Sequence, residues 1–171
     1  MKPLTISILL ISLILIPNSG YSLKHDIEGW GDLNWSDSME SAKNKIDAEY
    51  TQFEDENLKY LCWKKEIIKK NFVVATGFLD NKLVAIALSN KDVRGPDRLE
   101  AADVQTILKA YVSKYGEPTE HQSPFSLQDK YIWIGKSGDL EITLTRLGLN
   151  YQMEIIYKTK TLEKKIESDD I

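Results

Sequence analysis

Two periods of hydrophobic and polar residues run along the chain, one typical of helices and the other typical of strands. The clearest helical pattern is a continuous apolar stripe of about four turns, made by Val104, Ile107, Leu108, Tyr111, Val112 and Tyr115. Gly116 and Pro118 follow it, and this order is typical of a helix end. A shorter helix is predicted after Ser38, a favourable N-cap residue, because apolar residues recur there at helical spacing: Met39, Ala42 and Ile46.

Alternation of apolar and polar residues predicts six strands, arranged in two sets of three. The predicted strands cover residues 58–65, 72–79, 82–88, 130–135, 140–146 and 151–158. Asp80 and Asn81 lie between the second and third strands, and both residue types tolerate the positive φ of a two-residue hairpin turn. The acidic run 54–56 and the polar segment 117–126, which contains two prolines, are predicted to be loops.

The elements therefore follow the order helix, three strands, helix, three strands. Clean alternation indicates an antiparallel sheet with one buried face and one face in water. We expect an α+β fold with an α-βββ-α-βββ layout, in which two helices pack on one face of a single antiparallel sheet. Residues 23–159 are expected to form this single domain, and residues 160–171 a charged C-terminal tail.

Residues 1–22 have the features of a secretory signal peptide. Lys2 precedes an apolar run over residues 4–16, which is shorter than the roughly 20 residues that a membrane-spanning helix needs. Gly20 and Ser22 are the small residues expected before a cleavage site. A mature chain starting at Leu23 would be periplasmic or secreted, with no stable membrane span. The alternative is an uncleaved N-terminal anchor.

The charge and cysteine content exclude several classes of protein. The chain has 171 residues, with 22 Lys and Arg against 26 Asp and Glu, and its net charge of −4 argues against sequence-independent binding of nucleic acid. A single cysteine excludes an internal disulfide and a multi-cysteine metal site. Cys62 is expected to be a small buried residue in a strand, with a reactive thiol or an intermolecular disulfide as the alternative.

No motif for catalysis or cofactor binding stands out. The two histidines, His25 and His121, are not spaced as metal ligands, and no nucleophile motif accompanies them; His121 is expected to be a solvated loop residue. Residues 135–138 contain a Gly-Lys-Ser triplet but lack the upstream glycine of a phosphate-binding loop, so they are interpreted as a turn. The four tryptophans are interpreted as anchors of the core and of helix starts. We therefore expect a protein that is not an enzyme and binds no cofactor or metal.

Several short motifs resemble the layout of a group of small exported bacterial proteins. They are Trp30-Gly31 before the first helix, the hairpin over 78–83, the helix end Tyr115-Gly116-Glu117-Pro118, Trp133, and Ile156-Tyr157 in the last strand. The architecture is similar to the helix–sheet repeats of beta-lactamase-inhibitor-like proteins and of small outer-membrane assembly lipoproteins. The resemblance covers about residues 30–158 and implies a protein-binding module, while the lipidation cysteine of those lipoproteins is missing here.

The polar side of the last two predicted strands supplies the candidate binding residues. They are Glu141, Thr143, Thr145, Gln152 and Glu154. An uncovered face of an antiparallel sheet offers a broad surface, and we expect it to bind an unidentified protein partner, in the manner of an inhibitor. The alternative is a carrier of a lipid or another small apolar molecule, held between the helix over 104–115 and the sheet, because the strand over 72–79 is apolar on both faces.

Overall fold

The computed structural model describes residues 23–55, 58–90 and 95–162. Its helices are α1 (Met39–Lys45) and α2 (Ala101–Tyr115). Its strands are β1 (Gly29–Trp30), β2 (Leu33–Asn34), β3 (Tyr50–Asp55), β4 (Leu58–Ile67), β5 (Lys70–Leu79), β6 (Lys82–Ser89), β7 (Glu120–Phe125), β8 (Gln128–Ile134), β9 (Gly138–Leu147) and β10 (Asn150–Thr159). The predicted signal peptide and most of the predicted tail lie outside the described residues. Within the described ranges, no helix is long and apolar enough to cross a membrane.

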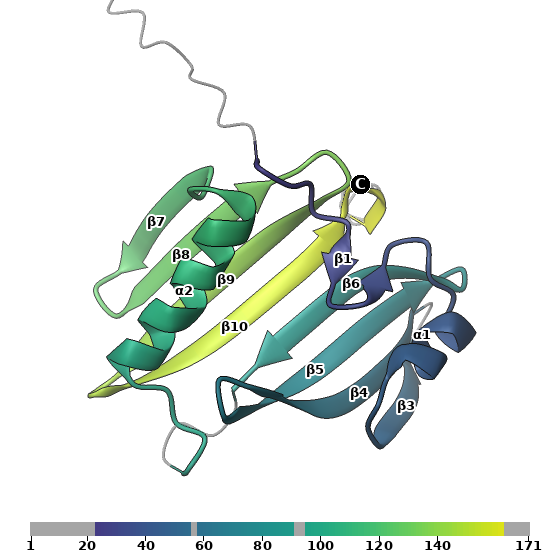
Figure 1. The fold of residues 1–171 in the computed structure, drawn as a ribbon, viewed down its shortest axis with the longest axis horizontal. Coiled ribbons are helices and arrows are strands. Elements are labelled where there is room, and N and C mark those ends of the chain that lie inside the picture. The colour runs from purple at the N-terminus through teal and green to yellow at the C-terminus, as the bar shows by residue number, and fades with distance from the viewer. Residues whose placement is uncertain (1–22, 56–57, 91–94, 163–171) are drawn as a thin grey trace, which may run out of the picture.

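Strands β3 to β10 form one antiparallel sheet in the order β3-β4-β5-β6-β10-β9-β8-β7 (Figure 1). Each half of the sheet consists of four consecutive strands that follow one helix, so the chain contains two α-ββββ repeats. The halves join at the centre, where β6 pairs with β10. In this register Ile86 lies opposite Tyr157, and Leu88 lies opposite Ile155.

The predicted layout is one strand short in each half. The α+β class and the antiparallel sheet are confirmed, but the prediction of three strands per half is wrong, because β3 and β7 are additional strands at the two edges. β3 covers residues 54 and 55 of the predicted acidic loop, and β7 covers most of the predicted loop over 117–126. Every residue of both strands is exposed, so neither strand has the apolar face on which the prediction depends.

The predicted helix and turn signals are confirmed. Ser38 is the N-cap of α1, and its side chain accepts a hydrogen bond from the backbone N–H of Ser41 at 3.1 Å. α2 ends at Gly116, whose φ of 89° lies in the region that favours glycine. Asp80 and Asn81 have φ of 49° and 60°, as a two-residue hairpin turn between β5 and β6 requires.

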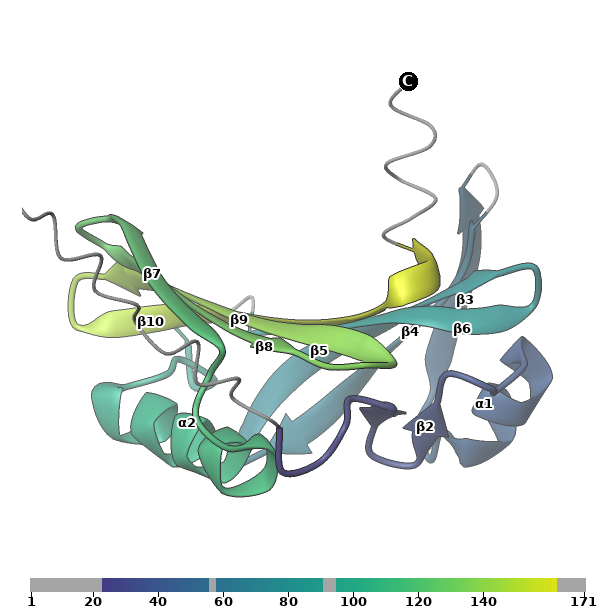
Figure 2. The same cartoon turned by 90° about the horizontal axis from the view of Figure 1, so that it is seen from above.

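The helices pack on the same face of the sheet, and the N-terminal segment over 23–37 crosses that face between them (Figures 1 and 2). The edge strands β3 and β7 turn away from the helices, which makes the opposite face concave (Figure 2). Neither helix packs on this concave face, and among the residues that the structure describes only the short turn at 160–162 rises from it, at the end of β10. We call this face the open face.

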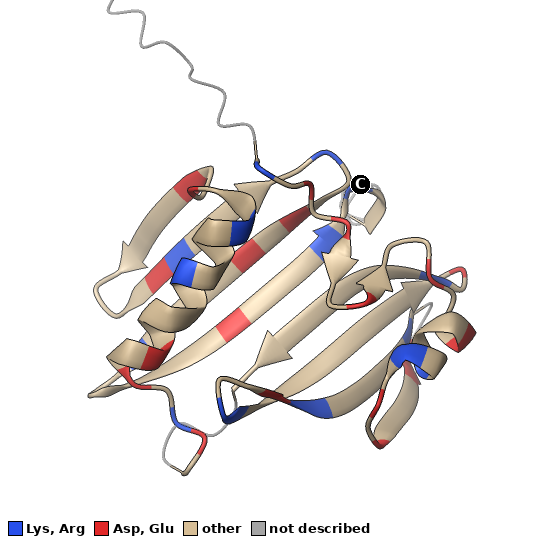
Figure 3. Cartoon of the chain, viewed as in Figure 1, with Lys and Arg blue, Asp and Glu red and all other residues tan. Residues whose placement is uncertain are grey.

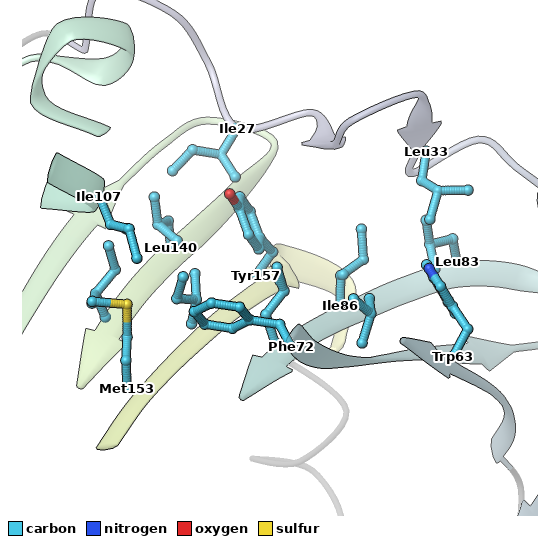
Figure 4. Packing of buried hydrophobic residues seen from close by; sticks show 14 of the residues in the cluster. Ile27, Leu33, Trp63, Phe72, Leu83, Ile86, Ile107, Leu140, Met153 and Tyr157 are labelled. Carbon is cyan, nitrogen blue, oxygen red and sulfur yellow. The ribbon is translucent and has the colours of Figure 1, made fainter. Parts of the chain in front are cut away.

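The hydrophobic core lies between the sheet and the layer formed by the helices and the N-terminal segment. Ile27 of the N-terminal segment points toward Leu140 and Tyr157, and all three residues are at most 1% exposed (Figure 4). Trp133 is fully buried, and its Nε1 donates a hydrogen bond to the Gly116 carbonyl at 2.9 Å. The interpretation of the tryptophans as anchors is confirmed, since Trp63 is also buried and both Trp30 and Trp35 pack against the core.

Candidate binding face

The five predicted binding residues lie together on the open face. Residues that lie opposite each other in an antiparallel pair share a face of the sheet. The register places the five residues in three such pairs: Thr143 with Glu154, Thr145 with Gln152, and Glu141 with Ile156. The structure therefore brings the five side chains into one patch over β9 and β10, while their role in binding stays a prediction.

The two carboxylates of this patch have different surroundings. Glu141 is partly buried, its Oε1 lies 2.9 Å from Lys130 Nζ, and it accepts a hydrogen bond from Thr143 Oγ1 at 3.2 Å. Glu154 is exposed, and its cross-strand neighbours are the uncharged Thr143 and Ser89. Among the described residues, none forms an ion pair with Glu154. Glu154 is therefore the carboxylate that a basic group of a partner can meet without displacing a neighbouring cation.

Small side chains cover the β5–β6 part of the open face. The cross-strand pairs there are Ala75 with Ala87 and Gly77 with Ala85. A Cβ at Gly77 would lie 3.5 Å from the Tyr60 ring, so this ring lies beside the glycine. Phe53 of β3 stacks on Tyr60 with ring centroids 4.7 Å apart. The middle of β5 and β6 carries no charged residue, while acidic residues lie along β9 and β10 (Figure 3).

Cys62 lies beside these small residues, opposite Ala75 in the register of β4 and β5. Its predicted place in a strand is confirmed, but its predicted burial is wrong, because the residue is only partly buried on the open face. Together with Thr51, Lys64 and Val73, it lines a shallow hollow of about 590 Å³. Since Cys62 is the one cysteine of the sequence, a thiol reagent labels the open face at a single position.

Residues 135–137 of the predicted turn connect β8 to β9, which begins at Gly138, and this turn binds a carboxylate of the same chain. Asp26 accepts hydrogen bonds from the backbone N–H of Lys136 at 2.8 Å, the backbone N–H of Ser137 at 3.1 Å and the Ser137 hydroxyl at 2.6 Å. Burial opposes ionisation of Asp26, but these hydrogen bonds outweigh it and hold the pKa of the carboxyl below its ordinary value. A Cβ at Gly135 would lie only 2.5 Å from Asp26 Oδ1. The donors of this turn are thus occupied by Asp26.

The sequence pattern missed a polar cluster where β7 meets β8. The prediction that His121 lies in a loop is wrong, because it is a β7 residue whose ring stacks on Tyr131 with centroids 4.4 Å apart. His121 Nε2 lies 3.3 Å from Asp129 Oδ1, which also accepts a hydrogen bond from Ser123 Oγ at 2.6 Å. In a serine-hydrolase triad the histidine lies between the serine and the carboxylate. In this cluster the carboxylate of Asp129 lies between Ser123 and His121, so the order differs from that of a triad. In the described ranges, no three His, Cys, Asp or Glu residues are grouped to hold a metal ion.

A groove of about 510 Å³ lies between α2 and the β7–β8 hairpin. Its apolar lining residues are Leu108, Val112, Pro118, Tyr131 and Trp133. Further in, aromatic rings fill the space beneath α2, because Tyr111 packs against Tyr115, Trp133 and Tyr157.

Strand β5, whose two apolar faces suggested a ligand carrier, does not lie beneath α2 (Figure 1). One side of β5 contributes Phe72, Val74 and Phe78 to the core, and the other side carries small residues of the open face.

Comparisons of the chain with protein-family models, with curated proteins and with solved structures find no match. The resemblance suggested by the short sequence motifs therefore stays a prediction. The functional assignment depends on the open face and on the chemistry of its described residues.

Proposed function

We propose that the chain is an exported, non-enzymatic binding module that captures another protein on the open face of its sheet. The supporting observation is the uneven cover of the sheet, since both described helices and the N-terminal segment pack on one face and neither helix packs on the other. The sheet has eight strands of six to ten residues, and neighbouring strands lie about 4.8 Å apart. The area of its open face is therefore large enough for the roughly 800 Å² that each partner buries in a specific complex. Export to the periplasm or the medium rests on residues 1–22 of the sequence.

The chemistry of the open face favours one kind of partner. The small residues Ala75 and Ala87 leave room for a large apolar side chain, next to the ring pair formed by Phe53 and Tyr60. Glu154 stands on the other side of these small residues and offers a negative charge. A fitting partner is therefore a protein that presents a large apolar side chain next to Lys or Arg. Burial of the apolar side chain would supply most of the affinity, and the charge pair would orient the complex.

A charge reversal at the centre of the patch tests this proposal. Thr143→Arg with Glu154→Arg replaces the expected attraction by repulsion and adds bulk to the face. We expect capture of the partner from envelope and secreted fractions of the source organism to fall about tenfold or more. Lys109→Glu, on the exposed side of α2, is the control and should capture normally. Thermal unfolding must be unchanged in both variants, and undiminished capture by the double variant would rule out this patch.

A carrier of a small apolar molecule is the second candidate, and the groove between α2 and the β7–β8 hairpin favours it. Native mass spectrometry of protein purified without detergent distinguishes the two functions. A stoichiometric adduct that is lost in Leu108→Arg would support the carrier. A bare mass in the unaltered protein would count against it and leave the protein-binding module.

A further inference from the structure

The two edges of the sheet differ in how they resist further strand pairing. An edge strand presents unpaired backbone N–H and C=O groups, which proteins protect with proline, bulges, charged side chains (above all lysine) or cover. β7 contains Pro124, and its register with β8 shifts between Gln122 and Phe125. β3 has no proline, glycine or lysine, and its six residues pair with β4 without a shift. The β7 edge is thus blocked by two features of its backbone, while the backbone of β3 is regular and its charged residues are Glu54 and Asp55.

We propose that β3 pairs with β3 of a second copy of this chain, antiparallel and with Phe53 on the two-fold axis. The axis is perpendicular to the sheet, so the two eight-stranded sheets become one continuous sheet with both open faces on the same side. The inference concerns self-association through an edge, and it does not depend on the proposed capture of another protein.

The sequence of β3 is complementary to itself in this register. With Phe53 opposite its own copy, Thr51 lies opposite Asp55, and Gln52 lies opposite Glu54. Each acidic residue therefore faces an uncharged polar residue, and directly opposed like charges, which are destabilising, are avoided. Lys59 Nζ also lies 4.0 Å from Glu54 Oε1 within one copy and reduces the negative charge at this edge.

The neighbouring registers that keep the two faces aligned are less favourable. Centring the pair on Glu54 would oppose two copies of Glu54. Moving the centre by one residue the other way, to Gln52, would oppose Asp55 to Glu49. Both arrangements set like charges directly against each other. Charge therefore selects the register centred on Phe53.

Phe53 supplies the apolar contact at the proposed axis. Its side chain is 47% exposed in the single chain, and its ring stacks on Tyr60 at an interplanar angle of 13°. Residues directly opposite in an antiparallel pair have Cβ atoms about 5 Å apart, so the two copies of Phe53 would lie side by side. The dimer would then carry a row of four aromatic rings across the junction, and aromatic cross-strand pairs are stabilising.

Light scattering coupled to gel filtration tests the dimer. At about 100 µM, well above a micromolar Kd, we expect the unaltered protein to have the mass of a dimer. Phe53→Lys should give a folded monomer, because two cations would meet at the axis. Phe125→Lys, the same change at the 71% exposed position of the blocked edge, should stay dimeric. A monomeric unaltered protein, or a Phe53→Lys variant that stays dimeric, would overturn the proposal.

Cysteine cross-linking tests the register. In a Cys62→Ser background, Phe53→Cys would bring two thiols together across the axis, because opposing Cα atoms lie about 5 Å apart and allow a disulfide. Thr51→Cys in the same background is on the same face of the same strand, but its two copies would be about 14 Å apart. Mild oxidation should give a covalent dimer for Phe53→Cys and none for Thr51→Cys. The reverse result, or no cross-link from either variant, would contradict the register centred on Phe53.

Discussion

At the scale of single residues, Asp26 fixes the position of the N-terminal segment on the sheet. Its carboxylate accepts hydrogen bonds from Lys136 and Ser137 and so attaches residue 26 to the β8–β9 turn. Trp35 Nε1 then donates a hydrogen bond to the Ile27 carbonyl at 2.7 Å and folds the segment back on itself. These contacts hold the segment on the helix side of the sheet, away from the open face.

Substitution of Asp26 should reveal this attachment through the pH dependence of stability. We expect Asp26→Asn to lower the free energy of unfolding by about 1–2 kcal/mol at neutral pH, because charge-assisted hydrogen bonds are lost. The folded-state pKa lies below the unfolded value of 3.8, so the contribution of ionised Asp26 is complete above that value and is lost as the pH falls through the folded pKa. Urea unfolding across this pH range measures it. The difference between the two proteins should shrink below about pH 4, and a constant difference would contradict the attachment.

At the scale of elements, a hydroxyl pair joins α2 to β10. Tyr157 donates a hydrogen bond to the Tyr111 hydroxyl at 2.9 Å. Burial raises the pKa of Tyr111 to about 12, and burial together with Tyr111 and Tyr115 raises that of Tyr157. Both hydroxyls are therefore protonated at neutral pH and removed from most of the solvent, and the Tyr111 hydroxyl has that of Tyr157 as its hydrogen-bond donor.

A double-mutant cycle should measure this pair. Tyr157→Phe leaves the Tyr111 hydroxyl without its donor, and we expect it to cost about 1–2 kcal/mol of unfolding free energy. Tyr111→Phe should cost no more than this, because the Tyr157 hydroxyl also interacts with Tyr115. The double variant should cost less than the sum of the two single variants, because the hydrogen bond between the two hydroxyls can be lost only once. Additive costs in denaturant unfolding would show that the two hydroxyls act independently.

Elements with one buried face were predictable, and elements without one were not. The stripe of α2 and the alternation of Leu140, Ile142 and Leu144 in β9 reflect burial on one side, so local periodicity identifies them. β3 had a weaker signal, because Tyr50, Thr51 and Phe53 are strand-forming residue types next to an acidic run. Pro124 and the lack of any buried residue removed that signal from β7.

The same distinction applies to the candidate binding face. Alternation alone puts the five predicted residues on the polar side of β9 and β10, and the register confirms that they share a face. The pairing of β6 with β10 joins segments more than 60 residues apart, as Ser89 opposite Glu154 illustrates. Local periodicity carries no information on such a pairing. For this reason the small residues of β5 and β6 could not be predicted as part of the same surface.

At the scale of the whole molecule, the two repeats have the same topology but different surfaces on the open face. The first repeat contributes small residues and the ring pair of Phe53 and Tyr60, and the second contributes hydroxyl, amide and carboxylate groups. A partner lying across the junction of β6 and β10 would contact both kinds of surface. This division supports a single asymmetric protein partner over two equivalent ligands.

Photo-crosslinking from Cys62 tests most directly whether the partner lies on the open face. The unaltered protein is labelled with a benzophenone maleimide at Cys62, and a Cys62→Ser, Lys109→Cys variant carries the same label on the exposed side of α2. After irradiation with envelope and secreted fractions of the source organism, we expect one dominant cross-linked protein from Cys62. The yield should fall sharply in the variant with Thr143→Arg and Glu154→Arg, and the label on α2 should not trap that protein. Trapping of the same protein from α2 but not from Cys62 would contradict capture by the open face.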